Sequence, residues 1–190
     1  MDIAFCSARG LIDSAIYLLE HIEDNGYFKN TNKYSFILVS AASLESLLND
    51  GIILWALNTF PRDSYKRHAE AFLSMNLAKK IDALGYLISA GKFITDNNNE
   101  TYKTLSNLIK LRNEVAHSKG FFSEVDIKYS TSEEKRNSLM LPIESIQKRE
   151  PKVLNISHLK CESIIKALQE LEGILSYEIA FLDSNLLKPL

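Results

Sequence analysis

The segment from Tyr34 to Phe60 constrains the fold more than any other part of the sequence. Apolar residues recur along it at helical spacing, which predicts one long helix over residues 33–58. This apolar stripe consists of Ile37, Ala41, Leu44, Leu48, Ile52 and Trp55. Polar residues at positions 45, 49 and 50 interrupt the segment, so we expect a buried helix and not a membrane span. A helix that is apolar over so much of its circumference is expected at the centre of the fold.

Further segments with the same helical spacing are separated by capping and turn residues. Ser74, the run from Asp96 to Asn99, and Ser157 are expected to begin helices, and Gly91 is expected to end one. The remaining predicted helices cover residues 8–24, 62–73, 75–90, 100–119 and 157–183. We therefore predict an all-α fold, a mostly antiparallel helical bundle of about five to six helices.

Residues 121–156 lack this helical period. Val125, Ile127 and Tyr129 alternate with polar residues, which indicates a small irregular or β-hairpin insertion that could cover or widen a neighbouring site. No repeat or flexible linker divides the chain. We expect a single domain over residues 1–190 with the insertion inside it.

The composition argues against several classes of protein. The formal net charge of the 190 residues is −2, so no basic field extends over the whole chain and any RNA contact must be a local patch. Cys6 and Cys161 do not form a disulfide framework, and no His-Glu-x-x-His or Cys-x-x-Cys pattern predicts a metal. The N-terminus lacks a secretory signal pattern. We expect a cytoplasmic protein without a metal or cofactor and without a membrane contact.

The stretch from Leu111 to His117 carries the strongest functional signal. At 100° per residue, Arg112 falls on the apolar stripe of its helix, about 20° from Leu105, where a guanidinium needs an anionic partner. Asn113 and His117 lie four residues apart and can form a hydrogen bond. A permanent cation beside a titratable base held by an amide suits a phosphate group.

Arg112 and His117 do not point at one atom on a straight helix. Five residues separate them by roughly 140° around the axis and about 7.5 Å along it. The two groups converge if the last helical turn unwinds toward Gly120, or if two chains bring their copies together across a two-fold axis. The second arrangement predicts a homodimer with a composite active site.

The run Arg112-Asn113-Glu114-Val115-Ala116-His117 resembles the signature of the HEPN superfamily. Members are typically homodimeric helical bundles, and many are metal-independent endoribonucleases that act as toxins of toxin–antitoxin pairs or in phage defence. The resemblance implies that Arg112 and His117 are the catalytic pair and that Asn113 is the polar residue after the arginine. One toxin subgroup has a modified Tyr two residues after the histidine, where this chain has Lys119.

The expected function is cleavage of an RNA substrate through its 2′-hydroxyl, which leaves DNA intact because DNA lacks this nucleophile. An antitoxin or other regulatory partner would restrain such an enzyme. The alternative is a non-catalytic dimeric HEPN-like module that binds nucleotide or RNA. A purely structural interpretation also stays open, in which Arg112 and Asn113 tie helices together and His117 favours a helix C-terminus.

Several residues are candidates for supporting roles. Glu45 could pair with Arg112 and hold its guanidinium, or could reach water at the edge of its helix. Trp55 and Tyr102 are interpreted as core residues and not as base-stacking residues. The candidate RNA-backbone contacts are Lys110, Lys119, Arg62 and Arg67. The alternative for the last two is a solvated helix face.

Overall fold

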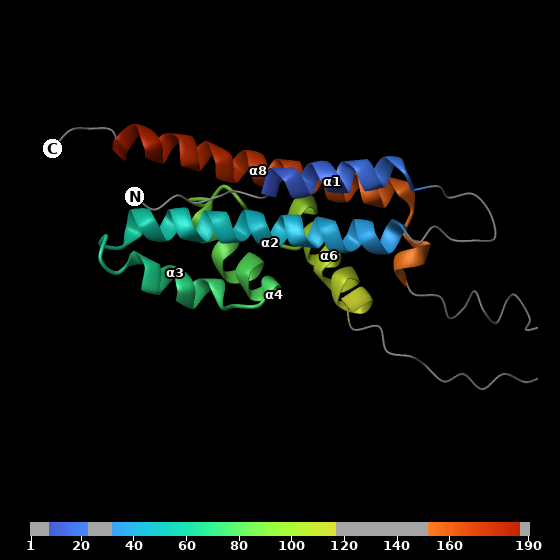
Figure 1. Cartoon of the computed structure of the whole chain (residues 1–190), viewed down its shortest axis with the longest axis horizontal. Helices are drawn as coiled ribbons and strands as arrows, with labels where there is room; N and C mark the ends of the chain where they lie inside the picture. Colours follow the sequence, from blue (N-terminus) through green and yellow to red (C-terminus); the bar gives the residue numbers. More distant parts are fainter. Residues whose placement is uncertain (1–7, 23–31, 117–151, 187–190) are drawn as a thin grey trace, which may run out of the picture.

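The computed structural model describes residues 8–22, 32–116 and 152–186. Every regular element in these ranges is helical, which confirms the predicted all-α class (Figure 1). A π-helical turn, η1 (Lys80–Leu84), and a 3-10 turn, η3 (Lys152–Asn155), accompany the α-helices. The α-helices are α1 (Ala8–Glu20), α2 (Asn32–Thr59), α3 (Tyr65–Leu73), α4 (Leu77–Lys79), α5 (Gly85–Ile88), α6 (Glu100–Ala116) and α8 (His158–Leu186).

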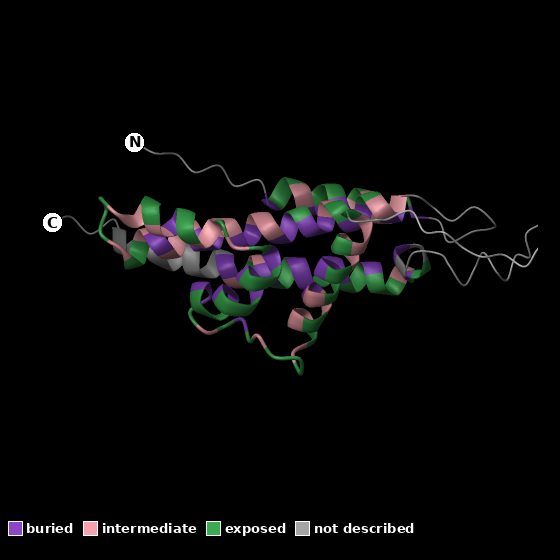
Figure 2. Cartoon of the chain, turned by 90° about the horizontal axis from the view of Figure 1, so that it is seen from below, coloured by how far each residue is buried: buried purple, intermediate pink, exposed green. Residues whose placement is uncertain are grey.

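Helix α2 lies at the centre, as its apolar stripe predicts. It packs against α1, α3, α6 and α8, and α1 runs in the opposite direction to α2 and α8 (Figure 1). Buried residues line the sides of the helices that face one another (Figure 2). Of the predicted stripe, Trp55 is only half-buried, and the fully buried members are Ile37, Ala41, Leu44, Leu48 and Ile52.

Among the described residues, α2 is also the helix that is long and apolar enough, by length and composition, to cross a membrane. Half of the residues in its most apolar window are buried inside the protein. Packing against four other helices accounts for this apolar character, because a central helix must bury most of its circumference.

The predicted helix 75–90 is a composite of three short elements. Asn76, and not Ser74, caps its start, because the Asn76 Oδ1 accepts a hydrogen bond of 2.9 Å from the Lys79 backbone N–H. The π-helical turn then separates α4 from α5. The backbone leaves this stretch at Ala90 and Gly91, both with positive φ, as expected for a helix end marked by glycine.

Helices α6 and α8 begin where the capping residues predict. The Tyr102 N–H donates to Asn99 Oδ1 at 2.9 Å, and the Lys160 N–H donates to Ser157 Oγ at 3.4 Å. The helical spacing of apolar residues in 157–183 also predicts that Leu159 lies on the buried face of α8, but Leu159 is 73% exposed. Nine residues separate it from the buried Leu168, and this spacing places the two on roughly opposite sides of a helix at about 100° per residue.

The predicted insertion 121–156 lies outside the described residues up to position 151. Its last residues form η3, and Val153 and Ile156 are buried in the core. The ammonium of the buried Lys33 donates a hydrogen bond of 2.9 Å to the Ile156 carbonyl, which fastens η3 to the start of α2. The end of this segment is therefore part of the core and not a strand or a flap.

Candidate functional site

Arg112 lies on the last turns of α6, where its side chain is half-buried. The guanidinium Nη1 donates a hydrogen bond of 3.1 Å to the amide oxygen of Asn113, which is itself exposed. Among the described residues, Arg112 forms no ion pair. A guanidinium has five N–H donors, so most of them remain for an anion that approaches the end of α6.

Asn113 contacts Arg112 through its side-chain oxygen. The Asn113 oxygen accepts this hydrogen bond, and its amide N–H groups have no acceptor among the described residues. His117 and Lys119 lie outside the described residues. The contact between Asn113 and His117, and the composite site of a homodimer, therefore stay predictions.

Glu45 does not pair with Arg112 in the described part of the chain, which corrects that expectation. Its carboxylate lies 3.6 Å from the ammonium of Lys80, and its side chain is 42% exposed. The Lys80 ammonium also donates a hydrogen bond of 2.8 Å to the side-chain oxygen of Asn49. The π-helical turn brings Lys80 against α2. Lys80 and Glu45 lie on different helices, so helical spacing in the sequence does not predict this contact.

Tyr102 connects the same π-helical turn to α6. Its hydroxyl donates a hydrogen bond of 2.8 Å to the Asp82 carboxylate. This hydrogen bond, followed by desolvation, raises the pKa of Tyr102 above its usual value of 10.0. The ring packs against the core, as predicted, and the hydroxyl holds α6 beside η1.

The candidate RNA-backbone residues fall on two different parts of the fold. Arg62 and Arg67 are exposed, just before and on α3, which packs against α2. Lys110 lies on α6 and lines a groove beside α8. Arg62 and Arg67 therefore belong to the α3 part of the surface, whereas Lys110 and Arg112 belong to α6.

An aromatic cluster lies where α2 meets α3. Trp55 makes edge-to-face contacts with Phe60 and Phe72, and Phe60 stacks on His68 with ring centroids 4.0 Å apart. Because its contacts are with neighbouring protein rings, Trp55 serves as a packing residue, as we expected.

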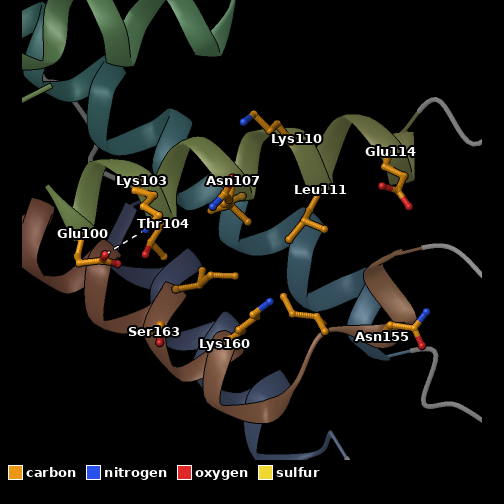
Figure 3. Close-up of a pocket in the computed structure, with 13 residues that line it drawn as sticks. Glu100, Lys103, Thr104, Asn107, Lys110, Leu111, Glu114, Asn155, Lys160 and Ser163 are labelled. Atoms are coloured by element: carbon orange, nitrogen blue, oxygen red, sulfur yellow. Dashed lines mark hydrogen bonds and ion pairs between the residues drawn. The ribbon is translucent and has the colours of Figure 1, made fainter. Parts of the chain in front are cut away.

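The groove between α6 and the start of α8 was not predicted from the sequence. Its volume is about 780 Å³, and Figure 3 shows side chains from both helices and from η3 around it. Lys160 on α8 and Asn107 on α6 line it together with Lys110. The packing of α8 against α6 brings Lys160 opposite Asn107, and spacing within one helix carries no signal for this.

Among the described residues, no group of three or more His, Cys, Asp or Glu side chains is arranged to hold a metal ion. Comparison with known proteins gives no family to which the chain can be assigned. No family model, curated protein or solved structure matches it.

Proposed function

We propose that the protein is a metal-independent endoribonuclease whose reacting groups belong to the C-terminal end of α6. The observation that carries this proposal is the Arg112–Asn113 pair. It presents a half-buried guanidinium that has no ion-pair partner among the described residues. Such a guanidinium can bind a phosphate through two parallel hydrogen bonds.

In the proposed reaction, His117 removes the proton from a ribose 2′-hydroxyl, and the 2′-oxygen attacks the adjacent phosphorus. The bond from phosphorus to the 5′-oxygen breaks, and the leaving oxygen takes a proton from a second imidazole, supplied by His117 of another copy of the chain. The products are a 2′,3′-cyclic phosphate and a 5′-hydroxyl. Arg112 stabilises the negative charge that develops on the phosphate oxygens.

The proposed biological setting is that of a toxin or a phage-defence effector in the cytoplasm. A ribonuclease that cuts the RNA of its own cell requires restraint, so an antitoxin or another regulatory partner belongs to the same proposal. These statements presuppose ribonuclease activity, so they fall if the protein does not cleave RNA.

The test is incubation of single-stranded RNA with the full chain in EDTA. The wild type should cleave and leave 2′,3′-cyclic phosphate ends, and 2′-deoxy substrates should stay intact. Arg112→Ala should lower the rate by roughly 10²–10³ and His117→Ala by roughly 10²–10⁴. Arg9→Ala is the matched control, because Arg9 is an exposed arginine on α1 in a surface ion pair with Glu172. Intact RNA with the wild type, or cleavage that persists in both variants, would refute the proposal.

The second candidate function is a non-catalytic module that binds RNA. The observation that favours it is the lysine- and amide-lined groove between α6 and α8, which needs no contribution from His117. Saturable RNA binding by a wild type that never cleaves would select this candidate.

A further inference from the structure

The groove between α6 and the start of α8 combines buried aliphatic residues with exposed polar side chains. Its base is aliphatic, and polar side chains surround it (Figure 3). At about 780 Å³ it falls in the size range of pockets that hold small ligands or short segments of a polymer. The aliphatic residues that line it are Leu108, Leu111, Ile156 and Ile164.

Three lysines and two glutamates line this groove, so its formal charge is +1. At one end, the Lys103 ammonium lies 3.2 Å from the Glu100 carboxylate, so these two charges offset each other. At the other end, Glu114 already has an interaction partner. Within the described part of the chain, the ammonium groups of Lys110 and Lys160 take part in no hydrogen bond or ion pair.

Lys160 is the better placed of the two lysines. Its side chain reaches from α8 toward α6 and ends in the middle of the groove, whereas Lys110 lies toward the outer edge of α6 (Figure 3). The side chain of Asn107 enters the same space from α6 (Figure 3). An ammonium beside a primary amide, over an aliphatic base, is suited to a phosphate next to a group with hydrogen-bonding edges and an apolar face.

The length of the groove favours a strand over a single small anion. It follows α6 from Glu100 to Glu114, which corresponds to about 21 Å at 1.5 Å per residue. Its last residues along α6 lie beside Arg112 and Asn113 in the sequence. A strand that lies along α6 therefore leads to the proposed reacting groups.

We infer that this groove binds a single-stranded segment of the RNA substrate, with Lys160 on a backbone phosphate. Asn107 meets the edge of an unstacked base, and the half-buried Leu111 contacts a base face. This inference deepens the proposed function. It rests on that function in one respect, because the proposed nuclease activity identifies the bound strand as RNA. A duplex has no unstacked bases to offer such a surface, so single strands are preferred.

The experiment measures binding separately from cleavage. A fluorescent 2′-O-methyl RNA ten-mer, which lacks the 2′-hydroxyl nucleophile, is titrated with the full chain by anisotropy in EDTA at several salt concentrations. Lys160→Ala should weaken binding roughly threefold to tenfold and reduce the slope of log affinity against log salt by about 0.7. Asn107→Ala should weaken binding without a change in that slope, because it removes no charge.

Lys166→Ala is the matched control. Lys166 lies on the same helix as Lys160, is also exposed and does not line the groove. Its substitution changes the net charge by the same amount and should alter neither the affinity nor the salt slope. A duplex of the same sequence should bind more weakly than the single strand.

The inference is overturned if Lys160→Ala and Lys166→Ala behave alike. It is equally overturned if the ten-mer does not bind while an acidic peptide does, since the groove would then be a protein-docking surface.

Failure of the proposed function gives a different set of results. If the wild type never cleaves RNA but Lys160→Ala lowers the affinity and the salt slope, the groove stands and the nuclease proposal falls. If cleavage depends on Arg112 but binding is indifferent to Lys160, the nuclease proposal stands and the groove assignment falls.

Discussion

The buried lysine of the π-helical turn allows a sharp test of what holds this turn against α2. Lys80 is only 2% exposed, and its ammonium donates a 2.8 Å hydrogen bond to the Asn49 side chain. The Glu45 carboxylate lies 3.6 Å away. Since the Glu45 side chain is 42% exposed, water can solvate it when its partner is removed. The main penalty of a substitution should therefore come from Asn49 and from the loss of packing.

Two substitutions at this position separate these contributions. Lys80→Met keeps most of the aliphatic stem and removes the ammonium, so we expect the free energy of unfolding to fall by about 1–2 kcal/mol. Lys80→Ala also removes buried methylenes and leaves a cavity, and we expect a loss of about 3–4 kcal/mol. The free energy of unfolding of each variant is measured by urea denaturation, and variants are compared only if their m values agree with that of the wild type. Lys79→Met is the matched control, because Lys79 is the exposed neighbour and its substitution should change stability by less than about 0.5 kcal/mol.

The reasoning also makes a prediction about the double variant. Replacement of Asn49 by Leu in the Lys80→Met background removes the unpaired acceptor, so part of the lost stability should return. If Lys80→Met is as stable as the wild type, the cost of burying the ammonium cancels its hydrogen bond. The lysine then does not stabilise the turn, and the argument is refuted.

Two further predictions concern Tyr102 and the glycines of the core. The raised pKa of Tyr102 means that its neutral form stabilises the fold through Asp82, so this contribution is complete below about pH 10 and is lost as the pH rises through the folded-state pKa. Tyr102→Phe should lower the free energy of unfolding by about 1 kcal/mol or less at neutral pH. It should also make the loss of stability with rising alkaline pH less steep, and an unchanged dependence of stability on alkaline pH would contradict this. A Cβ on Gly85 would lie 2.9 Å from the ring of Phe93, whereas on Gly51 it would lie 3.0 Å from the flexible end of an isoleucine. In the same denaturation assay, Gly85→Ala should therefore destabilise the protein by roughly 1–3 kcal/mol, and Gly51→Ala should be close to neutral. Equal effects of the two substitutions would contradict this, because they would show that the Phe93 ring moves aside freely.

The sequence by itself determined the helical class, the central helix and most helix ends. Helical periodicity and capping are local properties, because a helix repeats every 3.6 residues and its ends are satisfied by residues within one turn. Asn99 and Ser157 therefore predicted the starts of α6 and α8, and Gly91 predicted the end of the helical stretch before them. The same local reasoning placed Arg112 and Asn113 together at the end of α6.

The pairing of residues between helices was decided only by the tertiary structure. The residue beside Glu45 is Lys80 of the π-helical turn, whereas the sequence had offered Arg112 or water as alternatives. Lys160 faces Asn107 because α8 packs beside α6, and no spacing within either helix contains that information. Contacts of this kind depend on the angles and offsets at which helices cross, which are set by the packing of the whole core.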